Sequence, residues 1–553
     1  MNNPNTNCWY ADNPNNFFFS FRASANRSST ALPLVCNSGF LLLDSGEGDP
    51  SFIYRCQDRY FAYNSMVGLR SIFFVLNDEH FDIYTQSIEN LRQRLLESDA
   101  WNGVWGNLFL PEPCFLPCDI YRCEVPFTPL LERQMQRLEV RDSINATGLF
   151  CNQVSPTLSL LLGQWLQHIR DIVPSFIDFY KLALSGEIAI RFHDKLSYVK
   201  LLQAVPEDTL PLHAPTITLT IEELLDIRTW SDLSQRFIAA TNDAISPTAF
   251  YIKSSFDSGG NAAAILTQKD YGEKYAAFKE ELLGSLSLMD SSYCLAELRA
   301  AISAQQTWSA MTLPEETLAA YATAWTKKRS QQPLSIIVQR HIRRTAKPDT
   351  LLPYGIGYNL WIAPSGDCKV LAIAAQVYSD PEYKHHLGAW LSTDLANRIA
   401  NLIPFAKVRN LASQFVLEGY CGPIGFDAIL NESGEYEFIY DCNPRLTAVF
   451  PALAVRTFLI KQGFVVESVL NLDYRGRFQL ADRQTMNKLS ERGWLFEPNR
   501  PSGILYVPSL AKQDGFDVVM VNMSLEEMNA AVLSGLLGDG RDDDKGTITR
   551  LYC

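Results

Sequence analysis

Apolar residues recur along the chain with two spacings, every second residue in short stretches and every third or fourth residue in longer ones. The first spacing is typical of strands and the second of helices, so a mixed α/β fold is predicted. Before residue 186 the pattern predicts strands at 39–43, 52–54, 60–62 and 71–76, and helices at 83–96 and 156–170. Residues 1–30 are rich in Asn and Ser and are expected to be irregular.

The middle of the chain mixes the two patterns. At 188–204 a short strand leads into a helix that Asp194 can cap and that carries Lys195 in its first turn. The helix dipole mildly disfavours a lysine there, which leaves two interpretations, a ligand contact or an ordinary surface lysine. Other strands are predicted at 214–220, 334–342, 358–363 and 368–378, the last two as an antiparallel hairpin, and helices at 275–286 and 317–325.

The segment 249–266 reads as a strand, a polar glycine loop and a second strand. The glycines Gly259 and Gly260, after Ser258, let backbone N–H groups approach phosphate oxygens, and Lys253 at the end of the first strand adds positive charge. An ordinary hairpin tip explains the same pattern equally well. The Walker A pattern G-x-x-x-x-G-K-[ST] is absent from the chain.

The stretch 419–445 is predicted to form a β-hairpin, because two apolar runs flank the turn signal 431–434. If 432–434 form a three-residue loop, Asp427 pairs with Ile439 and Gly425 with Asp441. Side chains alternate along a strand, so this register places Asp427, Asp441 and Asn443 on one face of the hairpin.

Two carboxylates and an amide oxygen on one face are the ligands that Mg²⁺ accepts together with nucleotide phosphates. Arg445 follows on the same face and can form two hydrogen bonds to a phosphate or a carboxylate. The alternative interpretation is a half-solvated hairpin with ordinary acidic side chains.

A polar loop is predicted at 380–388, after the hairpin that ends at 378. Gln376, Lys384, His385 and His386 are candidates for lining a reactive cleft, although adjacent histidines on a loop are more often solvated. Later elements are a helix at 447–460, strands at 503–507 and 518–521, and a helix at 525–537 that begins with a capping box of Ser524 and Glu527.

Composition narrows the class of protein. A chain of 553 residues with 47% apolar and 20% charged residues is expected to form three or four subdomains of a soluble globular protein. The net charge of −13 argues against nucleic acid or an anionic membrane as a partner. No run of 18 apolar residues and no signal-peptide pattern is present, and the twelve cysteines are scattered, so a cytoplasmic location is expected.

The order of these motifs resembles that of the ATP-grasp superfamily. Asp427, followed by Asp441-x-Asn443-x-Arg445, is similar to its closing signature, in which Glu is commoner than Asp at the position of Asp441. Lys195 resembles the opening lysine that contacts phosphates, and Lys253 with its glycine loop resembles the lid loop. The resemblance assigns ATP to Lys195, Lys253, Ser258, Gly259, Gly260, Gln339 and Ile342, Mg²⁺ to Asp427, Asp441 and Asn443, and catalysis to Arg445.

The resemblance implies an ATP-grasp domain at 186–460, with a lid at about 215–340, that residues 461–553 complete. Residues 31–185 look like the pre-ATP-grasp domain of pheganomycin-type peptide ligases. The implied activity joins a small-molecule carboxylate to an amine through an acyl phosphate, with an amino acid or peptide as substrate and ATP and Mg²⁺ as cofactors. A kinase that phosphorylates a hydroxyl, a non-catalytic nucleotide-binding module and a homodimer are left open.

Overall fold

The computed structural model describes strands and isolated residues of the first 194 positions and most of the chain after them. These are 34–37, 71–76, 93, 112–117, 150–151, 192, 195–206, 209–211, 213–241, 247–255, 263–288, 335–341, 352–362, 366, 368–379, 386–420, 422–430, 436, 438–444, 447–477, 482–508, 515–533 and 550–553. The strands predicted at 39–43, 52–54 and 60–62 and the helices predicted at 156–170 and 317–325 lie outside the described residues, and the helix at 83–96 is described only at Gln93.

The N-terminal part contains a parallel sheet in the order β3-β2-β1-β4. Its strands are β1 (Leu34–Asn37), β2 (Ser71–Leu76), β3 (Glu112–Pro117) and β4 (Phe150–Cys151). The apolar run predicted β2 correctly. Parallel neighbours need long crossover connections, which is consistent with the wide separation of these strands in the sequence.

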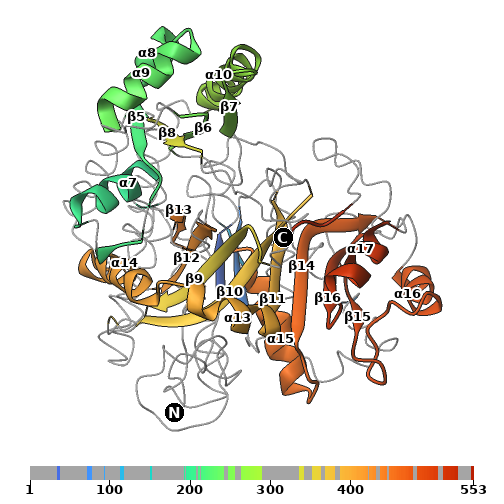
Figure 1. Ribbon diagram of the computed structural model, residues 1–553. Helices are drawn as coiled ribbons and strands as arrows, with labels where there is room; N and C mark the ends of the chain where they lie inside the picture. Colours follow the sequence, from blue (N-terminus) through green and yellow to red (C-terminus); the bar gives the residue numbers. More distant parts are fainter. Residues whose placement is uncertain are drawn as a thin grey trace.

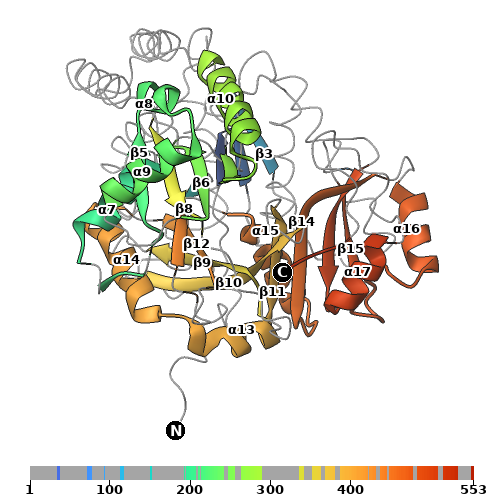
Figure 2. The ribbon, with the colours of Figure 1, turned by 45° about the horizontal axis from the view of Figure 1, so that its top comes forward.

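A second, antiparallel sheet has the order β5-β8-β6-β7. It consists of β5 (Thr216–Leu219), β6 (Ala249–Ser254), β7 (Ala263–Thr267) and β8 (Ile336–Arg340). Helices α8 (Ile221–Asp226), α9 (Trp230–Thr241) and α10 (Tyr271–Leu288) accompany it and appear in green beside it in Figures 1 and 2. This sheet, called the small sheet below, confirms the predicted hairpin at 249–266.

Alternation along the strands gives the small sheet two different faces. Phe250 and Ile252 of β6 are buried in an apolar cluster with Phe237 of α9. The other face of the sheet therefore receives the side chains of Tyr251, which lies between these two residues, and of Lys253, which follows them. One face of the small sheet thus builds a core, and the opposite face is available to a site.

The largest sheet has eight antiparallel strands in the order β13-β12-β9-β10-β11-β14-β16-β15. They are β9 (Gly355–Ile362), β10 (Cys368–Tyr378), β11 (His386–Ser392), β12 (Gly422–Ile429), β13 (Phe438–Asn443), β14 (Ser468–Arg477), β15 (Gly503–Pro508) and β16 (Gly515–Val521). Figure 1 shows this large sheet below the small one.

Helices accompany the large sheet. α15 (Val449–Lys461) packs on β10, β11 and β14, and α14 (Phe405–Leu417) packs on β10. The others are α13 (Thr393–Ile399), the 3₁₀ helix η6 (Ala400–Leu402), α16 (Asp482–Glu491) and α17 (Leu525–Leu533). Among the described residues, no helix is long and apolar enough to cross a membrane.

Most later predictions are confirmed, and one is wrong in part. β15, β16 and α15 lie where they were expected, and Ser524 and Glu527 form the capping box, with the Ser524 N–H donating to the Glu527 carboxylate at 2.7 Å. His386 and Gly388 were placed in a loop but belong to β11. His386 pairs with Tyr378 of β10, and from Gly388 onward β14 pairs with the other edge, so this stretch is a strand despite its polar start.

Asn522 follows β16 and has a positive φ of 51°. Its side-chain oxygen accepts the N–H groups of Glu467 and Ser468, and its amide donates to the carbonyls of Val465 and Pro501. Asn tolerates the left-handed region better than most residues, so one side chain fixes three chain segments.

We expect Asn522→Ala to lower the free energy of unfolding by roughly 2–3 kcal/mol, because it loses these hydrogen bonds and places a methyl group in the left-handed region. Asn522→Gly should cost less, since glycine adopts that backbone freely. Urea unfolding of both variants tests this, with exposed Asn401→Ala as the control. Equal losses for alanine and glycine would contradict the backbone argument.

Candidate active site

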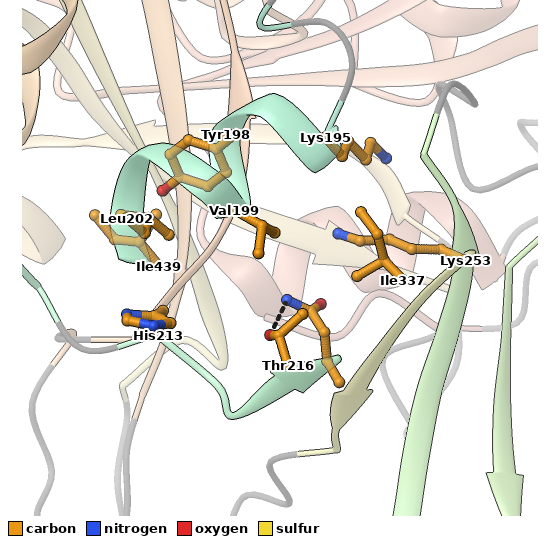
Figure 3. Close-up of a pocket in the computed structure, with 10 residues that line it drawn as sticks. Lys195, Tyr198, Val199, Leu202, His213, Thr216, Lys253, Ile337 and Ile439 are labelled. Carbon is orange, nitrogen blue, oxygen red and sulfur yellow. Dashed lines mark hydrogen bonds between the residues drawn. The ribbon is translucent and has the colours of Figure 1, made fainter. Parts of the chain in front are cut away.

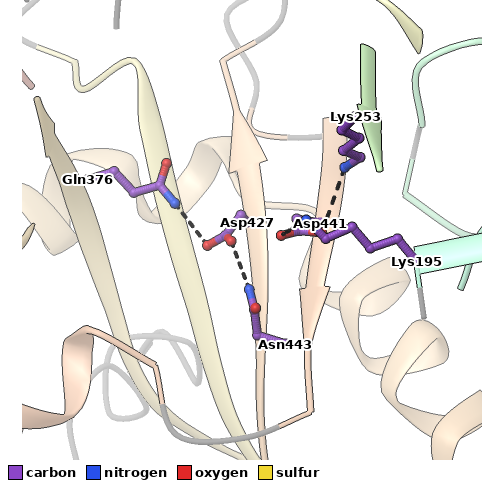
Figure 4. A network of polar contacts seen from close by, with 6 residues as sticks. All are labelled: Lys195, Lys253, Gln376, Asp427, Asp441 and Asn443. Atoms are coloured by element: carbon purple, nitrogen blue, oxygen red, sulfur yellow. Dashed lines mark hydrogen bonds and ion pairs between the residues drawn. The ribbon is translucent and has the colours of Figure 1, made fainter. Parts of the chain in front are cut away.

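The candidate site lies where the small sheet and helix α7 (Lys195–Ala204) approach the edge of the large sheet formed by β12 and β13. Figure 4 shows the side chains that meet there. α7 supplies Lys195, β6 supplies Lys253, and β12 and β13 supply Asp427 and Asp441. Segments far apart in the sequence therefore contribute charged groups to one place.

The hairpin of β12 and β13 forms with a register that differs from the predicted one. Asp427 pairs directly with Asp441, and Gly425 pairs with Asn443. The predicted partner of Asp427, Ile439, pairs instead with Ala428, after an irregularity between Asp427 and Ala428. At Asp427 the error is two residues, so Asp427, Asp441 and Asn443 stay on one face, whereas at Ala428, after the irregularity, the error is one residue.

Asp427 is held by neutral amide donors. The Gln376 side-chain nitrogen donates to Asp427 Oδ1 at 2.8 Å, and the Asn443 side-chain nitrogen donates to Asp427 Oδ2 at 3.0 Å. Both oxygens of this carboxylate are thereby oriented. Because the Asn443 nitrogen is used in this way, its oxygen is the atom that can serve as a metal ligand.

Asp441 is held by two cations from different elements. Its carboxylate lies 3.7 Å from Lys195 Nζ and 3.8 Å from Lys253 Nζ. The Asp441 and Lys195 side chains are each 16% exposed, and that of Lys253 is 4% exposed. Little water screens these pairs, so they are stronger than ion pairs on a protein surface.

Burial lowers the pKa of Lys253 to about 8, in spite of the attraction of Asp441, which acts in the opposite direction. The neighbouring Lys195 lowers this pKa further. A lysine whose charged form is disfavoured in the free protein gains most from a ligand that brings negative charge. Perturbed pKa values of this kind are common at functional sites.

The backbone fixes the two lysines relative to one another. The Lys195 N–H, at the start of α7, donates to the carbonyl of Ser255, and the Ser255 N–H donates to the carbonyl of Ser335. Ser255 directly follows β6, two residues after Lys253. The start of α7 is thus connected to the end of β6, and both lysine side chains are presented together.

A small pocket, with room for little more than a water molecule, adjoins the lysines (Figure 3). It is lined by apolar side chains of α7, β8 and β13 and by polar groups on the site face of the small sheet. The lining residues are Lys195, Tyr198, Val199, Leu202, His213, Thr216, Lys253, Ile337, Gln339 and Ile439. Apolar walls with a few polar groups are typical of pockets for small molecules.

Two polar groups in this cavity are fixed. The Gln339 amide donates to the Thr216 hydroxyl at 3.2 Å, and that hydroxyl donates to the Ala214 carbonyl at 2.6 Å. Burial, followed by the nearby Cys442 and Asp441, raises the pKa of Tyr198 well above its ordinary value. Its hydroxyl is therefore protonated at neutral pH.

The structure brings six of the predicted site residues into this region, namely Lys195, Lys253, Gln339, Asp427, Asp441 and Asn443. Ser258, Gly259, Gly260, Ile342 and Arg445 lie outside the described residues, as do Lys384 and His385. Gln376, a candidate for the cleft, contacts Asp427. His386 is exposed, at the start of β11.

Sequence reasoning missed several residues of the region. Tyr198, His213 and Thr216 line the cavity, but each is an unremarkable residue in its own segment. The start of α8 was also missed, although the sequence carries a signal for it. Thr220 and Glu223 form a capping box there, and the pattern T-x-x-E that indicates such a box is visible in the sequence.

The donor set fits Mg²⁺. Among the residues that the structure describes, no group of three or more His, Cys, Asp and Glu side chains could hold a metal ion. Asp427, Asp441 and the Asn443 amide supply only hard oxygen atoms, which exclude soft ions as the preferred occupant. These side chains are fewer than the six ligands of Mg²⁺, so water molecules or phosphate oxygens would complete the coordination.

No family model and no curated protein sequence matches this chain. It is similar to the solved structure of an L-amino acid ligase from Bacillus licheniformis, with 13% identity, 91% of this chain and 96% of that chain covered, and a TM-score of 0.41. It is also similar to the ADP complex of purK, an N5-carboxyaminoimidazole ribonucleotide synthetase, with 10% identity, 93% of this chain and 99% of that chain covered, and a TM-score of 0.41. A third similar structure is D-alanyl-alanine synthetase A from Vibrio cholerae, with 9% identity, 79% of this chain and 95% of that chain covered, and a TM-score of 0.31.

If ADP binds with its phosphates beside Lys253, the pKa of this lysine predicts that binding takes up protons. In the free protein this amine loses its proton near pH 8, and a phosphate beside it would keep it charged. Uptake should be small at pH 7 and approach one proton at pH 9, so the affinity for ADP falls as pH rises through 8. Calorimetry in buffers of different ionisation enthalpy measures the uptake.

Lys253→Arg provides the control for this prediction, because arginine stays protonated throughout this range. The variant should bind ADP with no proton uptake from this position. Equal uptake by Lys253→Arg and the unsubstituted protein at pH 9 would show that another group titrates.

Proposed function

We propose that this protein is an ATP-dependent carboxylate–amine ligase of the ATP-grasp superfamily, which forms an amide bond through an acyl phosphate. The observation that carries the proposal is the convergence of Lys195 and Lys253 on Asp441, which lies directly opposite Asp427. Two cations for phosphate groups and two carboxylates for a divalent ion are the parts that phosphoryl transfer from ATP requires. The motif order supports the same assignment.

Asp427, Asp441 and Asn443 would hold Mg²⁺ together with phosphate oxygens of the nucleotide. The bound ion would neutralise negative charge on the terminal phosphates. The positions of the carboxylates favour this role, since Asp427 and Asp441 are paired on neighbouring strands and share one face.

The lysines would bind the phosphates, and the base would enter beside them, where the small pocket would have to widen. In the free protein both lysines face Asp441, and an incoming phosphate offers them a more highly charged partner. Val199, Ile337 and Ile439 give the cavity apolar walls that suit a flat ring, and Gln339 adds hydrogen-bonding groups.

The reaction that we propose has two steps. A carboxylate oxygen of the first substrate attacks the γ-phosphorus of ATP, a P–O bond forms, and the bond to the departing ADP breaks. The amine of the second substrate then attacks the carbonyl carbon, the C–N bond forms, orthophosphate leaves, and the amine loses a proton. Positioning and neutralisation of charge supply most of the catalysis in phosphoryl transfer, and Lys195, Lys253 and, from the sequence, Arg445 have these roles.

We also propose the division of labour along the chain. The small sheet and its helices, within residues 215–340, act as the lid subdomain, and the large sheet carries the metal-binding side chains. Because β14, β15 and β16 belong to the same large sheet, residues 461–553 complete the ATP-grasp domain. Residues 31–185 are the pre-ATP-grasp domain, and an amino acid or short peptide is the substrate class that the sequence resemblance implies.

The products distinguish this activity from its alternatives. We expect ADP and orthophosphate in equal amounts, dependent on a carboxylate and stimulated by an amine, when amino acids and dipeptides are supplied singly and in pairs. With the carboxylate alone, hydroxylamine should trap a hydroxamate. Release of AMP, or a stable phosphorylated alcohol as the product, would contradict the ligase assignment, and the second outcome would identify a kinase.

Asp441→Asn should abolish ADP release while it preserves the fold, because it keeps the shape of the side chain and removes the charge that faces both lysines. Asp441 is also a proposed ligand of Mg²⁺, and loss of one group that stabilises charge in the transition state costs about 100-fold or more in turnover. Asp394→Asn is the matched control, since Asp394 is an exposed aspartate paired with Arg398. Near-normal turnover of Asp441→Asn at ordinary Mg²⁺ concentrations would exclude the proposed site.

A further inference from the structure

We propose that Gln376 and Tyr378 are positioning residues for Asp427, and that the segment 550–553 keeps them in place. The inference rests on the proposed function, because Asp427 is there a ligand of Mg²⁺. It gives β10 and the distant segment 550–553 a role in aligning the carboxylate of Asp427.

A chain of two hydrogen bonds leads to Asp427. The Tyr378 hydroxyl donates to Gln376 Oε1 at 2.6 Å, and Gln376 Nε2 donates to Asp427 Oδ1 at 2.8 Å. An ionised carboxylate only accepts hydrogen bonds, so Asp427 takes the nitrogen end of the Gln376 amide. The amide oxygen then accepts from Tyr378, and this second bond holds the Gln376 side chain in position.

The pair is buried and closely surrounded. Gln376 is 8% exposed and Tyr378 is 5% exposed. They lie two residues apart on β10, so their side chains share one face of the sheet. Beneath them is Gly355 of β9, where a Cβ atom would lie 2.5 Å from Gln376 Oε1 and 2.8 Å from the Tyr378 hydroxyl. A residue with a side chain would displace both groups, so this part of the sheet is shaped to hold them.

The backbone of Tyr378 is fixed by the segment 550–553. The Tyr378 N–H donates to the Tyr552 carbonyl at 2.8 Å, and the Tyr552 N–H donates to the Tyr378 carbonyl at 2.9 Å. β9 pairs with β10 only as far as Ala375, so it does not pair with this residue. His386 of β11 pairs with Tyr378 on one side, and Tyr552 supplies the antiparallel partner on the side that β9 leaves open.

The segment 550–553 is itself anchored. Leu551 is buried in the apolar cluster of the C-terminal strands, and its N–H donates to the side chain of Asn529 in α17 at 2.7 Å. The connection therefore runs from α17 through Leu551 and Tyr552 to Tyr378, Gln376 and finally Asp427. Partners behind a metal ligand commonly change metal affinity by ten- to a hundredfold when they are removed.

Tyr378→Phe removes the first donor of the chain and keeps the ring. We expect it to weaken Mn²⁺ binding in the presence of ADP by about tenfold, measured from the electron paramagnetic resonance signal of free Mn²⁺. Gln376→Met should do the same. ADP binding without a metal ion should stay close to that of the unsubstituted protein, because neither variant touches the lysines or the cavity.

Tyr275→Phe is the matched control. The Tyr275 hydroxyl is also buried and donates to a carbonyl, that of Leu224, but it lies in the core of the small sheet. This variant should leave Mn²⁺ binding unchanged. Tyr552→Pro, which removes the N–H that donates to Tyr378, should weaken Mn²⁺ binding, and its effect should not add fully to that of Tyr378→Phe.

These measurements test the proposed function and the positioning role of Gln376 and Tyr378 separately. If the unsubstituted protein neither binds Mn²⁺ with ADP nor releases ADP, the proposed function fails. If it does both, and Tyr378→Phe and Gln376→Met bind Mn²⁺ as tightly as it does, Gln376 and Tyr378 do not position Asp427. An equal loss in Tyr275→Phe would also overturn the inference, because the effect would then reflect general loosening of the structure.

Discussion

The buried contact of Asp441 with Lys195 and Lys253 is the interaction on which the site depends. It joins β13 of the large sheet to α7 and to β6 of the small sheet. Burial lowers the pKa of Lys253 from 10.5 to about 8, which corresponds to roughly 3 kcal/mol against its charged form. Desolvation therefore outweighs attraction at this lysine, and a stabilising role for the contact does not explain why the lysine is there. Under the proposed function, the negative charge of the bound nucleotide explains it.

The same alternation of side chains that builds the cores also builds the site. In β6, Phe250 and Ile252 enter the apolar cluster of the small sheet, so Lys253 must point to the opposite face. In the large sheet, Cys442 is buried between Asp441 and Asn443, which are both partly exposed. Packing of the apolar residues therefore also determines the direction in which the neighbouring polar side chains point.

Local pattern explains what the sequence could predict, and pairing between distant segments explains what it could not. Two-residue periodicity identified the hairpin of Asp427 and Asp441, and because the register error there was two residues, both carboxylates stayed on one face. The irregularity after Asp427 has no signal in the pattern. β11 was missed because its polar start resembles a loop until β10 and β14 pair with it. The contact of Tyr378 with Tyr552 joins residues too far apart in the chain for any local pattern to link.

The two carboxylates of the site are balanced in different ways, and this has a consequence for binding. Asp441 faces cations that a phosphate can take over, whereas Asp427 is held by amide donors that leave its charge in place. Under the proposed function, a nucleotide draws the lysines toward its phosphates, and two negative carboxylates are then left for a divalent ion. Nucleotide and Mg²⁺ therefore assist one another, and by linkage the gain in affinity is the same in both directions.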